Sequence, residues 1–168
     1  MLEQKVHLNL MHIATNSGKI DISSEVKTAE LAKKFSQILK KADVVFLYGE
    51  IGVGKTTFVR HLIHNFQKKN NNELTEITSP TFNLINEYKI SNLTIQHCDL
   101  FRLKNNDEIK KIGLLENYTE TLTLVEWPEK IKNKPRNTID LIFEYGENVK
   151  KRFLTINNLG KKKLNESK

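Results

Sequence analysis

Cysteine is nearly absent from this chain, because Cys98 is the only one in 168 residues. A single cysteine excludes a disulfide within the chain and fits a reducing compartment. His97 precedes it, but no second cluster of His or Cys stands at metal-ligand spacing, so we interpret both as residues of a sheet. The scarcity of cysteine therefore favours a cytoplasmic protein without a structural zinc site.

Long apolar runs are also missing. No window approaches the roughly 18 consecutive apolar residues that a membrane-spanning helix needs, so we expect no membrane partner. The first dozen residues, MLEQKVHLNLMH, lack the continuous apolar run and the small-residue cleavage site of a signal peptide. At 168 residues, a single domain is the simplest expectation. Residues 1–15 are expected to be an N-terminal extension and residues 160–168 a flexible basic tail.

The net charge of +7 raises the question of nucleic-acid binding, because Lys and Arg displace counterions from phosphates. Only four of the 27 positive residues are arginines, and the lysines occur with abundant asparagine and isoleucine, as in proteins encoded by AT-rich genomes. A nucleic-acid footprint should gather its positive residues on one face or stripe. We therefore interpret much of the charge as a solvated surface.

Apolar residues recur with alternating helical and strand periods along the chain. Helices are expected over residues 24–41, 58–66 and 107–115, and strands over residues 44–48, 82–90, 93–100, 121–127, 138–145 and 152–157. A weaker alternation over residues 5–13 favours an edge strand or an ordered tail. Short polar turns join the second strand to the third and the fifth to the sixth as hairpins. This order predicts an α/β fold with a mixed sheet, a parallel core, antiparallel hairpins and flanking helices.

A glycine-rich loop, GEIGVGKTT, occupies residues 49–57 between an expected strand and an expected helix. Gly49, Gly54, Lys55 and Thr56 satisfy the P-loop pattern G-x-x-x-x-G-K-[ST]. The glycines let backbone N–H groups turn toward phosphate oxygens, and the helix that follows points its positive end at them. Lys55 should reach the β and γ phosphates, and Thr56 should offer its hydroxyl oxygen to Mg²⁺. The loop therefore predicts a P-loop NTPase domain.

Hydrolysis of a bound triphosphate also needs an acid near the magnesium and a group that positions water. Asp99 and Glu126 each end an apolar run, which would deliver a carboxylate to the carboxyl edge of a parallel sheet. We predict both as metal-associated and catalytic residues. The alternatives are a solvent-facing glutamate at position 126, and a capping role or an ion pair with Arg102 for Asp99.

Two further features are less specific. The segment TSPTF, residues 78–82, supplies hydroxyls that suit a nucleotide-sensing segment, although Ser-Pro-Thr is also ordinary at the entry to a strand. Trp127, the only tryptophan, follows Glu126 directly, and core packing is an equal interpretation for it.

With GEIGVGKTT, SPTF, HCDLFRL and LVEWPE in that order, the sequence resembles the TsaE (YjeE) family of small bacterial P-loop ATPases over residues 20–157. The resemblance implies an ATPase that uses ATP and Mg²⁺ and works with the TsaD and TsaB proteins in forming threonylcarbamoyladenosine next to the anticodon of tRNA. It also implies slow, partner-dependent hydrolysis, no transfer of the threonylcarbamoyl group by this protein, and contact with tRNA only through the complex.

The resemblance carries over to individual residues as well. It implies a nucleotide-binding set of Glu25, Thr28, Gly49, Gly52, Val53, Gly54, Lys55, Thr56 and Thr57. Of these, Glu25 and Thr28 would lie near the base. The implied catalytic residues are Lys55, Asp99 and Glu126, and the implied metal-associated residues are Thr56, Asp99 and Glu126. The chain departs from the family at Phe101, where a tyrosine is usual, and at Cys98, where an aromatic residue is common.

Other classes of nucleotide-binding protein share the glycine loop. A small P-loop kinase usually recruits several arginines to the moving phosphate, and this chain offers only four. A GTPase is disfavoured because NKPR, residues 133–136, lacks the aspartate of a guanine-reading N-K-x-D segment. A nucleotide-gated binding module, whose hydrolysis is incidental, stays open because a slow ATPase that acts by docking fits both descriptions.

Overall fold

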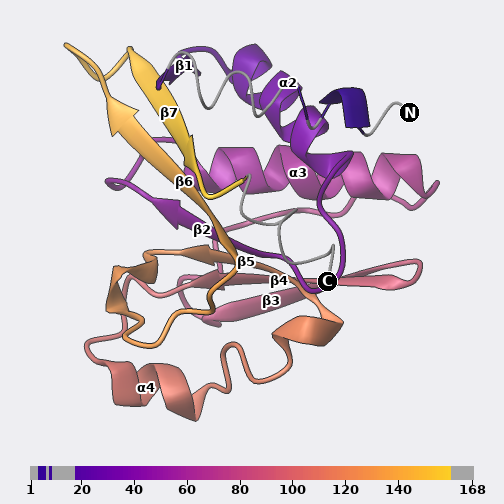
Figure 1. Cartoon of the computed structure of the whole chain (residues 1–168), viewed down its shortest axis with the longest axis vertical. Helices are drawn as coiled ribbons and strands as arrows, with labels where there is room; N and C mark the ends of the chain where they lie inside the picture. The colour runs from indigo at the N-terminus through magenta and orange to yellow at the C-terminus, as the bar shows by residue number, and fades with distance from the viewer. Residues whose placement is uncertain (1–3, 7, 9–17, 160–168) are drawn as a thin grey trace.

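The computed structural model describes residues 4–6, 8 and 18–159, and its centre is one seven-stranded sheet (Figure 1). The strand order across the sheet is β1-β7-β6-β2-β5-β4-β3. The strands are β1 (Ile20–Asp21), β2 (Val44–Tyr48), β3 (Ile85–Ile90), β4 (Leu93–Asp99), β5 (Leu122–Glu126), β6 (Thr138–Tyr145) and β7 (Arg152–Asn157). The helices are α2 (Glu25–Ser36), α3 (Lys55–Lys69) and α4 (Asn106–Lys111), with short 3₁₀ turns at Tyr118–Glu120 and Pro128–Lys130.

The pairing of the strands confirms the predicted mixed sheet. β2 pairs in parallel with both β5 and β6, and β4 pairs in parallel with β5. Antiparallel pairing joins β3 to β4 and β6 to β7, which are the two expected hairpins, and joins β1 to the outer side of β7. The parallel centre aligns the carboxyl ends of β2, β4 and β5 along one edge of the sheet.

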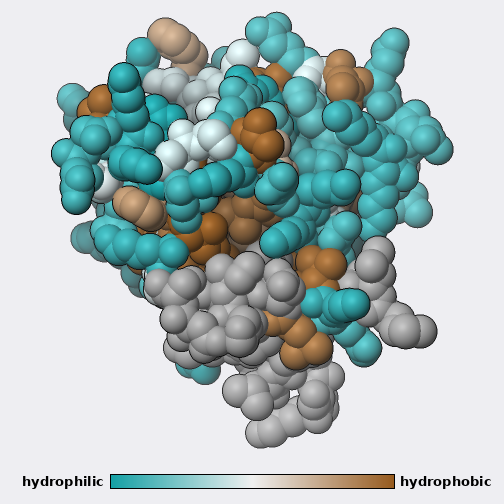
Figure 2. Space-filling model, turned by 90° about the horizontal axis from the view of Figure 1, so that it is seen from above, coloured by the Kyte–Doolittle hydropathy of each residue, from teal (hydrophilic) through white to brown (hydrophobic). Residues whose placement is uncertain are grey.

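The sheet separates two apolar layers, and successive side chains of β2 point alternately into one layer and the other. Val45 and Leu47 pack in the layer with α2 and α3, whereas Val44 and Phe46 face the layer around α4 and the loops that flank it. All four side chains are at most 1% exposed. A strand that is buried on both faces needs apolar residues at every position, which the sequence of β2 provides. In the view from above α2, the outer surface is mostly hydrophilic, broken by small hydrophobic patches (Figure 2).

Local signals set where the helices begin and end. Ser24 caps α2 by accepting a hydrogen bond from the Lys27 N–H, and α2 ends at Ser36, five residues before the predicted end. The cap of α4 is Asn105, whose side chain accepts from the backbone N–H groups of Asp107 and Glu108. Beyond α4, Gly113 adopts φ +66°, a conformation that ends the helical run before residue 115.

Some expectations differ from the structure at the ends of elements. β3 begins at Ile85 rather than at residue 82, because the Leu84 N–H closes a turn onto the Pro80 carbonyl and Leu84 has φ +65°. Residues 4–6 and 8 are helical, so the edge-strand prediction is wrong there. The rest of residues 1–15 and the tail at 160–168 lie outside the described residues. Across the described part of the chain, no helix is long and apolar enough to cross a membrane.

Candidate functional site

The glycine loop connects β2 to α3, and its glycines adopt positive φ angles. Gly49 has φ +134°, Gly52 +76° and Gly54 +118°. Gly49 also passes close to β6, because a Cβ atom at this position would lie 2.4 Å from the Phe143 carbonyl oxygen. Glycine is therefore required at position 49 by space as well as by conformation. The loop turns sharply at the edge of the sheet and leads directly into the N-terminus of α3.

Lys55, the first residue of α3, is buried beneath this loop. It is 4% exposed, and its ammonium group donates to the Gly49 carbonyl at 2.6 Å and the Glu50 carbonyl at 2.9 Å. The same nitrogen lies 4.2 Å from the centre of the Trp127 ring. Burial lowers the pKa of Lys55 below its ordinary value of 10.5, although the carboxylates of Glu126 and Asp99 oppose this shift. The hydrogen bonds that the structure gives this ammonium group go to carbonyl oxygens, and a ring face packs beside it.

The two predicted acids lie side by side. Asp99 and Glu126 are register partners at the ends of β4 and β5, and they are 4% and 3% exposed. The Thr56 hydroxyl donates to Glu126 Oε1 at 2.9 Å. The alternative of a solvent-facing glutamate is therefore wrong. The edge of the sheet brings an α3 hydroxyl and two strand-end carboxylates into one place.

Asp99 has its own set of donors. Its Oδ2 accepts from the Ser79 hydroxyl at 2.5 Å and from the Thr81 hydroxyl at 3.1 Å, and its Oδ1 accepts from the Phe101 N–H at 2.9 Å. The hydroxyls of the SPTF segment therefore contact the predicted acid. Arg102, the alternative partner of Asp99, instead places its guanidinium 4.0 Å from the centre of the Phe82 ring.

The interpretation of His97 as only a sheet residue misses a contact. His97 is fully buried in β4, and its Nε2 lies 2.9 Å from Glu126 Oε1. The available signal was the period of two in a strand, which puts His97 on the same face as Asp99. Cys98 points the opposite way and is a buried core residue of the α4 layer, as expected of a sheet residue.

A pocket of about 420 Å³ opens over these groups. Its lining residues are Ile51, Gly52, Gly54, Lys55, Thr56, Thr57, Ser79, Thr81, Asp99, Phe101, Arg102, Glu126 and Trp127. The lining includes five of the nine expected nucleotide-binding residues. Of the others, Gly49 contributes the carbonyl that Lys55 contacts, and the Val53 side chain is buried in the core.

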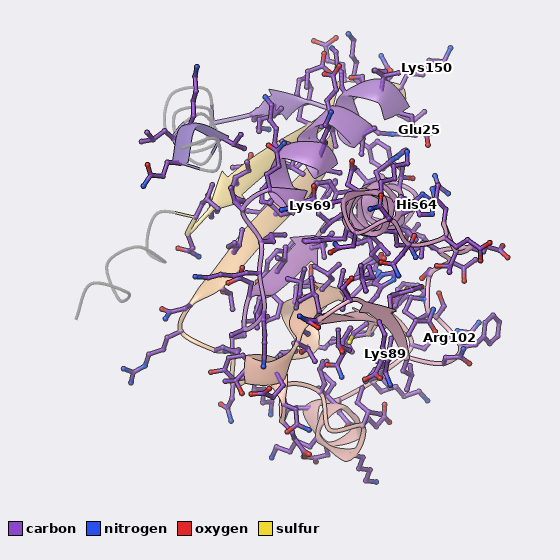
Figure 3. All side chains as sticks on the ribbon, turned by 90° about the vertical axis from the view of Figure 1, so that its right-hand side faces the viewer. Glu25, His64, Lys69, Lys89, Arg102 and Lys150 are labelled. Carbon is purple, nitrogen blue, oxygen red and sulfur yellow. The ribbon has the colours of Figure 1, made fainter. Side chains whose placement is uncertain are left out.

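Glu25 and Thr28 lie at the start of α2, in a separate small cavity of about 80 Å³ that also touches Gly54 and Thr57. Glu25 is turned toward α3, where its carboxylate lies 2.9 Å from His61 Nε2 and 3.3 Å from Arg60. The hydrogen bond with His61 lowers the pKa of Glu25 below its ordinary value. Figure 3 shows Glu25 above α3, which is seen end-on, and Arg102 below it.

A buried strand, a glycine loop with an inward lysine, and carboxylates at the edge of a parallel sheet define a P-loop protein of the nucleotide-binding class. The family model described as "Threonylcarbamoyl adenosine biosynthesis protein TsaE" matches residues 22–153. The chain therefore belongs to the TsaE family.

Individual relatives agree with this assignment. A tRNA threonylcarbamoyladenosine biosynthesis protein TsaE from Rickettsia bellii is 47% identical over 112 residues, which span 67% of this chain and 75% of that protein. The protein of the same name from Aquifex aeolicus is 36% identical over 133 residues, or 79% and 92% of the two chains. The crystal structure of Bacillus subtilis YdiB superposes with a TM-score of 0.58 at 22% identity, covering 89% of this chain and 95% of YdiB, and supports the fold.

Proposed function

We propose that this protein binds ATP with Mg²⁺ and hydrolyses it slowly, as an accessory ATPase in the formation of threonylcarbamoyladenosine in tRNA. The observation that carries the proposal is the convergence of Lys55, Thr56, Asp99 and Glu126 on one pocket beside a glycine loop. Membership of the TsaE family supports the tRNA-modification role, because the matching relatives are named for that pathway.

The donors in the pocket fit a magnesium nucleotide. Mg²⁺ prefers oxygen ligands and commonly binds through one or two carboxylates together with substrate phosphates. Thr56, Glu126 and Asp99 provide a hydroxyl and two carboxylates of this kind, and the Thr56–Glu126 hydrogen bond holds two of the three groups together. Bound Mg²⁺ would neutralise charge on the phosphates. We assign Thr56, Glu126 and Asp99 to the ion, directly or through water.

The remaining residues have roles that follow from their positions. Lys55 exchanges the carbonyls of Gly49 and Glu50 for phosphate oxygens, which are stronger partners for an ammonium group. A carboxylate, Glu126 or Asp99, positions the attacking water. The backbone N–H groups of residues 49–57 surround the phosphates. Glu25 and Thr28 border the base, since their cavity adjoins Gly54 and Thr57.

The proposal includes the setting in which hydrolysis occurs. The protein docks in the cytoplasm on the TsaD and TsaB proteins, reaches tRNA through that complex, and does not itself transfer the threonylcarbamoyl group. Its own chemistry is confined to the phosphates of ATP.

Steady-state ATP turnover with and without the TsaD–TsaB pair tests this function. We expect turnover to rise with the partners, and Glu126→Ala to lower it by one or more orders of magnitude at saturating ATP. Glu116→Ala, which removes an exposed glutamate outside the pocket lining, is the matched control and should leave turnover unchanged. Fluorescence of Trp127, which contacts Lys55, provides a separate readout of nucleotide binding.

Two results would contradict the proposal. If Glu126→Ala hydrolyses ATP at the wild-type rate, Glu126 does not belong to the catalytic site. If the partners leave turnover unchanged and modified tRNA forms at its normal rate without this protein, the accessory role is wrong.

A further inference from the structure

Glu126 is held from its buried side by an imidazole. His97 is 0% exposed, and its Nε2 lies 2.9 Å from Glu126 Oε1, the same oxygen that accepts from the Thr56 hydroxyl at 2.9 Å. Both donors therefore bind one oxygen of the carboxylate, which leaves Oε2 as the atom of Glu126 that can face an incoming ligand.

The chemistry of the pair sets the direction of the hydrogen bond. An ionised carboxylate only accepts hydrogen bonds, so Nε2 of His97 carries the proton and donates. Nδ1 of the same ring is buried and finds no hydrogen-bond partner in the described part of the chain. The bond to Glu126 is thus the one polar interaction that the structure gives this ring. A buried imidazole with an unpaired nitrogen is less favourable than an apolar side chain of similar size, so packing alone does not account for histidine here.

The neighbouring acid explains why Glu126 needs its own donor. Asp99 and Glu126 are register partners, and two adjacent carboxylates repel each other. Asp99 is oriented by its own donors, the Ser79 and Thr81 hydroxyls and the Phe101 N–H. For Glu126, the Thr56 hydroxyl comes from the pocket side and His97 from the interior. Of these two hydrogen-bond donors, His97 is the one that can keep holding the carboxylate when a metal ion draws on the Thr56 hydroxyl.

We infer that His97 is a positioning residue for Glu126, which fixes Oε1 from the interior so that the carboxylate stays aimed at the magnesium and water side of the pocket. The inference rests on the proposed function, because it takes Glu126 to act at the metal. Residues that donate hydrogen bonds to ligating groups typically change metal affinity about 10- to 100-fold when mutated.

Two substitutions of His97 distinguish its hydrogen bond to Glu126 from its role in packing. The side-chain nitrogen of His97→Gln can occupy the position of Nε2, whereas that of His97→Asn reaches only the position of Nδ1. We expect His97→Asn to weaken the apparent Mg²⁺ affinity of the ATP complex about tenfold or more, and His97→Gln to stay within about threefold of wild type. Calorimetric titration of Mg²⁺ at fixed ATP measures this. ATP affinity in EDTA should be the same for all three proteins.

The outcomes are distinguishable. Wild-type Mg²⁺ affinity in His97→Asn would overturn the inference while leaving the proposed function intact. A wild-type protein whose ATP binding does not respond to Mg²⁺ would overturn the metal role of Glu126, and the inference with it. Nitrogen-15 NMR of the imidazole in the unmutated protein gives a test that does not depend on whether the variants fold. The Nε2–H tautomer is expected, and an Nδ1–H tautomer would show that His97 does not donate to Glu126.

Discussion

Under the proposed function, Lys55 would bind a phosphate at a cost to the folded state. Its ammonium group is buried under the glycine loop and is satisfied by two carbonyls and a ring face rather than by a full ion pair. Burial lowers its pKa, which means that the protonated form is less favourable in the folded chain than in the unfolded chain. A phosphate group would remove this penalty.

The lowered pKa predicts how stability depends on pH. Between the folded-state pKa of Lys55 and its ordinary value of 10.5, the unfolded chain binds more protons at this residue than the folded chain. The free energy of unfolding contributed by Lys55 therefore rises with pH through that interval, and the penalty is fully present below it. Lys55→Met has no titrating group at this position. We expect the wild type to gain stability relative to Lys55→Met as the pH increases toward 10.5.

Urea denaturation of the two proteins across the alkaline range measures this difference. A difference in the free energy of unfolding between the two proteins that stays constant across this pH range would contradict the prediction. In calorimetry, Lys55→Met should show no ATP binding, which separates the role of the ammonium group in binding from its effect on stability.

At the scale of residues, the groups that lie near the loop can be predicted from the sequence. The hydrogen-bond partners of those groups are harder to predict. Lys55 and Thr56 follow from the loop pattern, and Asp99 and Glu126 follow from their positions at strand ends. His97 could not be paired with Glu126 in advance, because their contact depends on β4 lying next to β5. A single sequence records no strand order, so the donors of each carboxylate became visible only in three dimensions.

Two of the three glycines in the loop are constrained in different ways. At Gly54, an added Cβ atom would meet nothing within 4 Å, but φ is +118°. At Gly49, φ is +134° and the added atom would also lie 2.4 Å from a backbone oxygen of β6. The first position is limited by conformation alone, whereas the second would also require the loop or the sheet to move.

This contrast predicts unequal costs for two matched substitutions. Gly54→Ala should lower the free energy of unfolding by an amount on the order of 1–3 kcal/mol, the usual cost of a strained backbone conformation. Gly49→Ala should lower it by more, because backbone strain and a steric clash with the Phe143 carbonyl add together. Urea unfolding of both variants gives the comparison. Equal losses would mean that the loop relaxes away from β6 at little cost.

The bounds of the helices and strands were predicted most accurately where the hydrophobic period and the turn residues indicate the same boundary. The bounds of β2, β6 and β7 match the expected residues: β2 is an apolar run, and β6 and β7 are joined by a polar turn. The two-residue β1 was missed, because it becomes a strand only by pairing with β7. Residues 37–41 leave the helix although their composition suits one, and the left-handed conformation of Ala42 at φ +70° marks the turn into β2.

The charge of the whole molecule predicts its behaviour with tRNA. A net charge of +7 attracts any polyanion, but only four of the 27 positive residues are arginines. We expect tRNA alone to bind weakly, with affinity falling at least about tenfold between roughly 50 and 200 mM salt, because counterion release would supply most of the free energy. Filter binding or fluorescence anisotropy measures this. Nanomolar binding that resists salt would indicate a direct and specific RNA surface.

The arrangement of the sheet was predictable only in outline. Alternating helices and strands indicated a mixed sheet with hairpins, but they did not place β2 between β5 and β6. That position depends on which apolar faces fit together beneath α2 and α3. The strand order therefore depends on long-range packing, which local sequence patterns do not specify.

The central position of β2 also has a consequence for how the chain is made. Val44 pairs with Thr123 and Thr138, which lie 79 and 94 residues later in the sequence. At about 5–20 residues per second, the ribosome leaves β2 without either neighbour for a time on the order of 10 s. Throughout that interval, a strand destined to be buried on both faces is open to solvent and to other nascent chains. β2 can therefore take its place between β5 and β6 only after residues 122–145 have been translated.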